Sequence, residues 1–371
     1  MNMKKTIITA LLALVALTAN AAVPDSLKKD LEDYDYLTSF TEENYAAFPA
    51  IMEQGYRKKY ETLKKRLRKQ VAKGKAGIEK AACEYAIWFY RNFDTHYQLN
   101  NVKLWESYEQ PVHIDYTKMM EYNPQPVSCK VDAQTWLVRV PSCVGENPTN
   151  EWVQQAAKDF QESGCEYLII DVRGNEGGST DIWNSFIAML VDHRRERTID
   201  NLFRNTQHNQ GYWEYALSES PENSYFKDFL KQCKDSLGKS EFLLWTSVDA
   251  SEVTPQPLPK RAAIIIDNGT CSAGEGLIYY NVKGVSNRAR VYGKERTYGA
   301  DLTGNVYYTK LPNADVYLTY PTCIKQKDFL EHHVFGANGI APDVSITLPY
   351  PKRLTDNIDE WVLWVAEDLK R

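Results

Sequence analysis

Apolar and amphipathic stretches alternate through the second half of the chain. Three segments rich in apolar residues are predicted to be strands, at 135–140, 165–172 and 262–267. Helical spacing of apolar positions follows each strand, at 152–160, at 181–191 and from residue 273 onward. The last two strands each contain a continuous apolar run, which is typical of strands covered on both faces. The alternation predicts an α/β core in which neighbouring strands run parallel.

The first part of the chain has a different pattern. The basic stretch 57–70 carries apolar residues at helical spacing, which indicates a helix with one solvated face. A second helix is predicted at 78–93, where an apolar stripe would face a core. We therefore expect an N-terminal helical domain at 23–110 and a core domain at 111–371.

Two further segments of the core domain stand apart from the α/β pattern. Residues 194–260 form an aromatic-rich insertion, which would either cover a cleft and contact ligand side chains or pack as a satellite subdomain. Residues 304–349 are predicted to form short β segments.

The extreme N-terminus has the pattern of an export signal. Lys4 and Lys5 precede an apolar run at 7–17, and small residues follow up to Ala22. A membrane anchor is the alternative, but the run is shorter than the roughly 20 residues that span a bilayer. We expect a signal peptide at 1–22, a secreted or periplasmic protein, and no transmembrane segment elsewhere.

Composition narrows the functional classes. Of the 371 residues, 43% are hydrophobic and 25% charged, as in ordinary globular proteins, and the formal net charge of -5 argues against nucleic-acid binding. The seven cysteines show no C-x-x-C spacing, so we expect no structural zinc and no other metal or cofactor. A bridge between Cys129 and Cys143 is one option, and small buried thiols are the other.

Two loops after predicted strands carry candidate chemistry. The first, at 171–179, contains three glycines that let the backbone approach a ligand closely. The second, at 268–275, places Ser272 at the start of a helix, where it would be either an ordinary N-cap or a nucleophile. Ligands bind at the carboxyl ends of strands in α/β sheets. A hydroxyl beside glycine N–H donors at that edge suits acyl transfer, which needs a nucleophile and an oxyanion site.

Four motifs, in order, resemble those of the carboxy-terminal processing and tricorn-core serine peptidases. They are Tyr-Leu-Ile-Ile-Asp-Val-Arg-Gly-Asn-Glu-Gly-Gly from 167, Thr-Cys-Ser-Ala-Gly-Glu from 270, Tyr-Gly-Lys-Glu-Arg-Thr-Tyr-Gly from 292 and Gly-Ile-Ala-Pro-Asp from 339. The resemblance covers about 130–350 and implies an α/β fold with a crotonase-like (ClpP/crotonase) core. The stretch between His96 and the strand at 135 is too short for the PDZ domain that this family often inserts.

The same resemblance implies roles for individual residues. It makes Ser272 the nucleophile, with the oxyanion bound by the N–H of Ala273 and that of Gly177 or Gly178. The Lys of the processing branch is missing, because Ala300 and Asp301 follow the Thr-Tyr-Gly at 297–299. His96, within Asp94-Thr-His96, matches the base of the tricorn-like branch. Gly336 stands where the family has its third catalytic residue, a Glu, so the nearby Glu331 is the candidate to orient His96.

Alternatives to these assignments remain open. Lys283 and Lys294 are the next candidate bases, and Cys271 is a second candidate nucleophile. The leading hypothesis is an exported serine peptidase that cleaves peptides or unfolded proteins. A catalytically inactive protein that binds a peptide or an apolar ligand on the same fold is the alternative. A crotonase-type acyl-CoA enzyme conflicts with export. The sequence leaves the natural substrate and the oligomeric state open.

Overall fold

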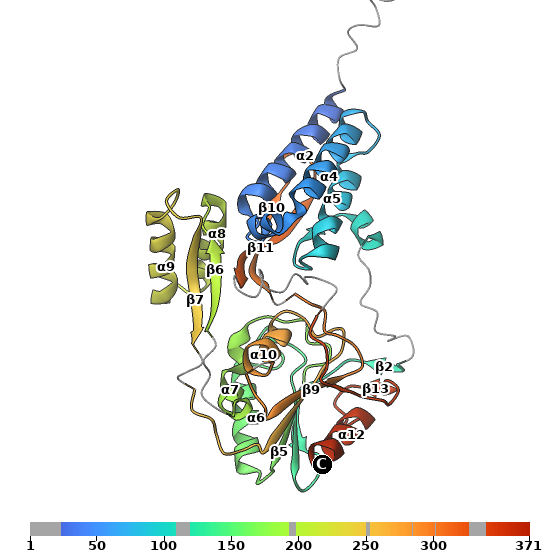
Figure 1. The fold of residues 1–371 in the computed structure, drawn as a ribbon, viewed down its shortest axis with the longest axis vertical. Coiled ribbons are helices and arrows are strands. Elements are labelled where there is room, and N and C mark those ends of the chain that lie inside the picture. Colours follow the sequence, from blue (N-terminus) through green and yellow to red (C-terminus); the bar gives the residue numbers. More distant parts are fainter. Residues whose placement is uncertain are drawn as a thin grey trace, which may run out of the picture.

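The structure is a computed structural model (Figure 1), and it describes residues 24–108, 119–192, 198–249, 253–283, 285–300, 302–325 and 339–371. The expected signal peptide at 1–22 lies outside these residues. Among the described residues, no helix combines the length and apolar character that crossing a membrane requires.

A six-stranded sheet forms the core of the lower body in Figure 1. Its strands are β3 (Val127–Lys130), β4 (Thr135–Arg139), β5 (Tyr167–Asp171), β8 (Arg261–Ile265), β9 (Ala289–Gly293) and β12 (Val344–Ser345). Their order is β12-β9-β8-β5-β4-β3, and every neighbouring pair is parallel except β3 with β4. The predicted α/β class and the three predicted strands are confirmed.

Both faces of this sheet are buried, as its continuously apolar strands require. On one face lie α6 (Asn150–Glu162), η4 (Thr180–Trp183), α7 (Asn184–Leu190) and α10 (Ala273–Asn281); on the other lies α12 (Glu360–Leu369). Successive side chains of a strand point to opposite faces. Ile170 accordingly packs towards the first group of helices, while Ile169 packs against α12.

The N-terminal region is helical, as predicted, and strands from the far end of the chain complete its core. Its helices are α2 (Asp25–Asn44), α3 (Phe48–Ile51), η1 (Met52–Tyr56), α4 (Arg57–Ala72), α5 (Ile78–Asn92) and η2 (Lys103–Ser107). Tyr85 and Phe89 of α5 are fully buried in one cluster with Tyr320. Tyr320 belongs to β11 (Tyr317–Lys325), which pairs with β10 (Thr303–Lys310). The helices are therefore stabilised by residues more than 200 positions away.

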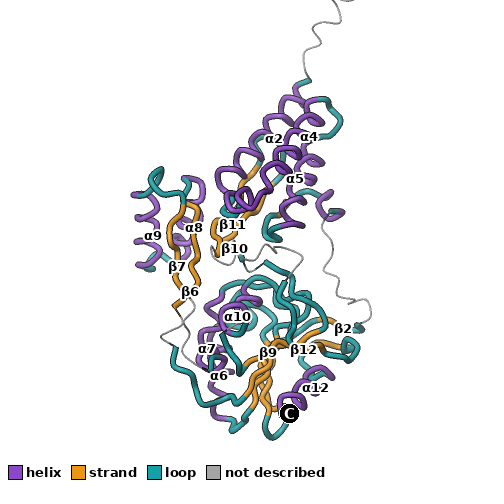
Figure 2. Tube along the Cα trace, in the orientation of Figure 1, coloured by secondary structure: helices purple, strands orange, loops and turns teal. Residues whose placement is uncertain are grey.

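The second sheet joins this helical region to the insertion (Figure 2). Its order is β1-β11-β6-β7, where β1 is Gln98–Asn100, β6 is Thr198–Arg204 and β7 is Phe242–Asp249, and β10 pairs with β11 off this path. The helices α8 (Gln207–Glu219) and α9 (Ser224–Asp235) pack on β6 and β7. Trp213 and Phe229 anchor a separate aromatic cluster there, so much of the insertion's aromatic content packs on itself. A small sheet of β2 (Glu121–Tyr122) and β13 (Arg353–Leu354) lies apart.

A buried ion cluster fixes the carboxyl ends of β4 and β5. The Asp171 carboxylate accepts hydrogen bonds from Arg139 Nε at 2.7 Å and from Arg173 Nη2 at 2.6 Å. Both arginines also reach Asp359, which caps the N-terminus of α12. Burial alone would raise the pKa of Asp171, but the two guanidinium groups hold it well below its usual range. The glycine turn therefore starts from a rigid anchor.

All seven cysteines are free thiols, so the Cys129–Cys143 bridge is wrong. Cys129 lies on β3, opposite Leu137 of β4. Cys143 lies beyond the end of β4, and its buried Sγ is 3.3 Å from the side-chain amide of Asn175. Cys129 therefore lies within the edge strand of the sheet, whereas Cys143 lies against the glycine turn.

Candidate active site

Ser272 occupies a sharp turn between β8 and α10. Its φ of 49° and ψ of -117° are unusual for a residue with a side chain, and such strain persists only where surrounding contacts enforce it. Two hydrogen bonds hold the preceding loop against the glycine turn. Cys271 N donates to Asn175 O at 2.7 Å, and Thr270 Oγ1 donates to Val172 O at 2.8 Å. The elbow therefore presents Ser272 at the carboxyl edge of the sheet.

The Glu275 carboxylate supports this elbow from within. It is buried and accepts the N–H of Ser272 at 3.0 Å, of Gly299 at 2.8 Å and of Ala300 at 2.7 Å, together with the Thr297 hydroxyl. Burial raises its pKa, against the opposing effect of these donors. The motif at 297–299 thus serves to bind a carboxylate that fixes the strained serine.

The glycine turn after β5 packs directly on the elbow. A Cβ on Gly177 would lie 2.7 Å from Ser272 Cβ and 3.0 Å from Ala273 N, so only glycine fits at this approach. The φ values of Gly177 and Gly178, 103° and 133°, also favour glycine. The two loops predicted to meet at the sheet edge therefore do meet.

The N–H groups around Ser272 are not equivalent. The Gly177 N–H donates to Asn175 Oδ1 at 2.9 Å, so it is already engaged. Within the described residues, neither the Gly178 N–H nor the Ala273 N–H has an acceptor. Ala273 is the first residue of α10, where the N–H groups have no partner inside the helix. These two donors are available to a ligand.

His96 lies against Ser272 although 176 positions separate them. Its Nε2 is 3.2 Å from Ser272 Oγ, and its side chain is 15% exposed. Its other ring nitrogen, Nδ1, is 2.9 Å from Thr303 Oγ1 and 3.6 Å from Asp94 Oδ1. The segment after α5 therefore delivers an imidazole to the hydroxyl, with both ring nitrogens in hydrogen-bonding contact.

The structure places several of the alternative bases elsewhere. Lys283 forms an ion pair with Asp343, and Lys294 Nζ donates to Leu348 O at 2.9 Å. His208, on α8, contacts the main-chain oxygen of Tyr308. Glu331 lies outside the described residues, as do His113, His193, His332 and His333. Among the histidines that the structure describes, His96 is the one that contacts Ser272.

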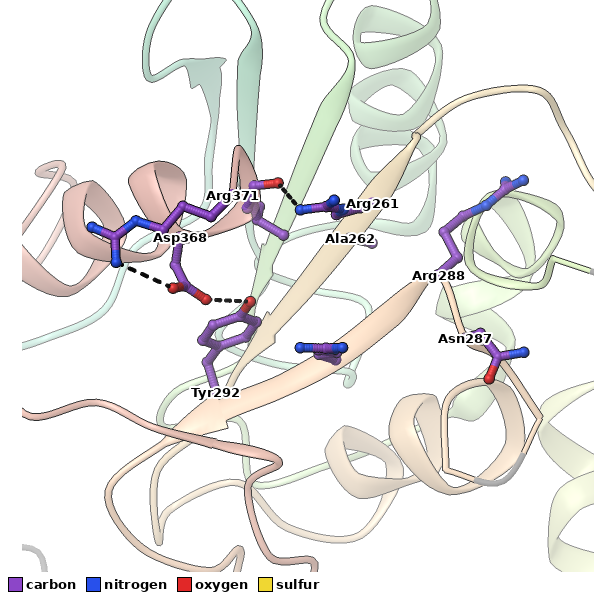
Figure 3. A pocket seen from close by; sticks show the side chains of 9 residues that line it. Arg261, Ala262, Asn287, Arg288, Tyr292, Asp368 and Arg371 are labelled. Carbon is purple, nitrogen blue, oxygen red and sulfur yellow. Dashed lines mark hydrogen bonds and ion pairs between the residues drawn. The ribbon is translucent and has the colours of Figure 1, made fainter.

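Two cavities flank the core sheet at opposite ends. One, of about 340 Å³, adjoins the glycine turn and is lined by Pro141, Ser142, Val144, Gly174, Glu176, Gly177 and Gly178. The other, of about 330 Å³, lies at the amino ends of β8 and β9 (Figure 3). It is rich in arginine, but Arg261 and Arg288 donate to main-chain oxygens of the surrounding fold. The first cavity is therefore the one placed to accept groups attached to a ligand at Ser272.

Within the described residues, no group of three or more His, Cys, Asp or Glu side chains is arranged to hold a metal ion. The Ser272 elbow provides a hydroxyl, an imidazole and the unengaged N–H of Ala273, and the glycine turn that packs on it carries the unengaged N–H of Gly178. This set can support acyl transfer.

The family model for peptidase family S41 matches residues 135–346, more than half of the chain. The chain belongs to peptidase family S41. The resemblance to carboxy-terminal processing and tricorn-core peptidases is thereby confirmed at the level of the family. The matched region of this S41 peptidase contains Ser272 and both loops, whereas His96 lies ahead of it.

Solved structures provide distant similarities to this S41 member. A Parabacteroides merdae protein is 16% identical, with a TM-score of 0.47, 88% of this chain covered and 91% of the other. A lipoprotein from Streptococcus agalactiae is 14% identical, with a TM-score of 0.46 and coverages of 95% and 99%. The photosystem II D1 C-terminal processing protease is 19% identical, with a TM-score of 0.34 and coverages of 58% and 44%. Among curated proteins, none matches this sequence significantly.

Sequence reasoning missed three residues of the site. Glu275 belongs to the nucleophile motif, but no feature of the sequence predicts that its side chain is buried beneath the Ser272 turn. Asp94 is visible in the sequence only as part of the Asp-Thr-His motif that contains His96. Thr303 lies 207 positions from His96, and nothing in its local sequence connects it with the histidine.

Proposed function

We propose that this S41 member is a serine peptidase in which Ser272 is the nucleophile and His96 the general base. The observation that carries the proposal is the 3.2 Å contact between Ser272 Oγ and His96 Nε2, next to the unengaged N–H of Ala273. A nucleophile and a base within hydrogen-bonding reach are the signature of activated serine. The same contact favours an enzyme over an inactive binding protein.

In the proposed first step, His96 Nε2 accepts the Ser272 hydroxyl proton while Oγ attacks the peptide carbonyl carbon. The carbonyl oxygen becomes an oxyanion, for which the N–H groups of Ala273 and Gly178 are the proposed donors. Gly177 is the less suitable of the two glycines, because its N–H already bonds to Asn175. Each such donor is worth roughly 10²–10³ in rate.

The intermediate then collapses, and protonated His96 gives its proton to the amine that leaves. An ester between Ser272 and the acyl part of the substrate remains. Water, deprotonated by His96, attacks this ester, and Ser272 recovers its proton as the acid is released. Peptides or unfolded proteins are the proposed substrates, in keeping with the peptidase family whose model the chain matches. We also propose that the parallel sheet is a crotonase-like core.

A fluorophosphonate probe tests the nucleophile without knowledge of the substrate. Wild-type protein should be labelled once, Ser272→Ala should not be labelled, and His96→Ala should react roughly 10²–10⁴-fold more slowly. Ser218→Ala, at an exposed position on α8, serves as the control and should label like wild type. Failure to label folded wild-type protein, or labelling that survives Ser272→Ala, would refute the assignment.

Export through the segment 1–22 is part of the same proposal. Its support is the basic start, the short apolar run and the small residues before residue 23. Expression of the full chain in a bacterium, followed by mass measurement of the product, should give a chain that starts at Ala22 or Val23. A product that keeps residue 1 would contradict this part of the proposal.

A further inference from the structure

We propose that Thr303 and Asp94 are the positioning residues of this site, with the Thr303 hydroxyl linking the His96 ring to the Asp94 carboxylate. The inference rests on the proposed function, because it concerns how His96 is prepared to act as a base. Its support is geometric. Thr303 Oγ1 is 2.9 Å from His96 Nδ1 and 2.9 Å from Asp94 Oδ1, so one hydroxyl contacts both groups.

The direction of these hydrogen bonds determines the tautomer of His96. An ionised carboxylate only accepts hydrogen bonds, so the Thr303 O–H donates to Asp94. A hydroxyl has one hydrogen, so its oxygen must then accept from His96 Nδ1. With the proton on Nδ1, the Nε2 lone pair faces Ser272 Oγ. This is the tautomer that a general base requires.

Burial makes the linkage rigid, and further hydrogen-bond donors surround the Asp94 carboxylate. Asp94 is 2% exposed and Thr303 is 8% exposed. Asp94 also accepts the main-chain N–H of His96 at 3.0 Å and the Tyr45 hydroxyl at 2.8 Å. Burial and the nearby Asp94 charge raise the pKa of Tyr45 well above its usual value, so this phenol remains a donor. Three donors therefore surround Asp94.

The linkage also stabilises the protonated ring that forms during catalysis. Within the described residues, His96 pairs with Asp94, whose Oδ1 lies 3.6 Å from His96 Nδ1. The Tyr45 phenol donates to Asp94, and the ring of Tyr97 packs on that of Tyr45; burial raises the pKa of both phenols. Asp94 is thus the negative charge that faces the imidazolium.

Substitution of Thr303 separates positioning from folding. Thr303→Val removes the hydroxyl at nearly constant volume, and we expect the second-order rate of fluorophosphonate labelling to fall roughly tenfold to a hundredfold, part of the 10²–10⁴ that a general base supplies. Thr303→Ser keeps the hydroxyl and should recover most of the activity. The control is Thr309→Val on the same strand, whose buried hydroxyl bonds to Tyr36 instead.

The pH profile provides a readout that a merely structural role would not move. Without the link to Asp94 the imidazolium is less stabilised, so the acid limb of the fluorophosphonate labelling rate should shift to lower pH by about one unit in Thr303→Val and in Asp94→Asn. An unchanged limb in Thr303→Val, or a limb that moves in Glu331→Gln and not in Thr303→Val, would overturn the proposal.

Nitrogen NMR of the histidine ring separates this inference from the peptidase assignment. In wild-type protein and in Ser272→Ala, with the ring neutral at alkaline pH, we expect a protonated Nδ1 and an unprotonated Nε2, with the signals identified by their loss in His96→Gln. Thr303→Val should lose this preference. A proton on Nε2 in wild-type protein would overturn the positioning role. Absent fluorophosphonate labelling with the expected tautomer would instead refute only the peptidase function.

Discussion

Gly177→Ala tests whether the contact between the two loops matters for chemistry. The added Cβ would stand 2.7 Å from Ser272 Cβ and 3.0 Å from Ala273 N. To restore an ordinary contact of 3.4 Å, Ser272 Cβ would have to move by about 0.7 Å. The substitution also forces a side chain onto a backbone with φ of 103°.

These two effects act on different quantities. Backbone strain lowers the free energy of unfolding by about 1–2 kcal/mol. Displacement of Ser272 acts on the rate, because a shift of this size directed away from His96 would take the 3.2 Å Ser272–His96 pair out of hydrogen-bonding range. A misplacement near 1 Å costs roughly a hundredfold in rate. We therefore expect reactivity to fall about a hundredfold while the protein stays folded.

The assay is the second-order rate of fluorophosphonate labelling, together with thermal unfolding. Gly55→Ala is the matched control, because Gly55 has φ of 92° and nothing within 4 Å of its added Cβ. It should lose similar stability and keep its labelling rate. A Gly177→Ala protein that labels within about threefold of Gly55→Ala would show that the close approach of the loops does not position the nucleophile.

Three further outcomes follow from buried contacts. Asp171→Asn should lower the free energy of unfolding by about 3–5 kcal/mol at pH 7, because two buried arginines lose the carboxylate that they share. The folded-state pKa of Asp171 is depressed, so the stability that its charge gives the wild type is lost as pH falls below about 4. The difference between the two proteins in urea unfolding should therefore narrow at pH 3. Glu275→Gln should turn an amide NH₂ towards other donors, cost about 1–3 kcal/mol in thermal unfolding and slow labelling at Ser272 about tenfold or more. Tyr45→Phe should lower the fluorophosphonate labelling rate about three- to tenfold by removing one donor to the positioning carboxylate; equal rates in Tyr45→Phe and in the control Tyr34→Phe would contradict this.

Local patterns along the chain predicted much of the fold. The segments at 165–172 and 262–267 are strands because a run of apolar residues must be covered on both faces, and both became central parallel strands. The amphipathic stretch 57–70 became α4 for an equally local reason. Tyr60, Leu67 and Val71 are buried along one side, and the lysines and arginines remain in water.

Motif spacing predicted part of the site. A serine before a helix and glycines after a strand are local features, and parallel strands bring such loops to one edge. The choice between Gly177 and Gly178 was beyond this reasoning. It depends on Asn175, whose side chain engages the Gly177 N–H and leaves that of Gly178 without an acceptor in the described residues.

Tertiary structure alone decided how the histidine is held. Sequence placed His96 beside Asp94, but the ring is oriented by Thr303, which comes from a strand 207 positions later. That strand lies against the helical region because Tyr320 and its neighbours complete a core that the helices cannot close by themselves. Secondary structure follows from short-range periodicity, whereas hydrogen-bond partners depend on which distant surfaces bury one another. For this protein the amino-acid pattern determined the strands, the helices and the two reactive loops, and long-range packing determined which side chains meet at the serine.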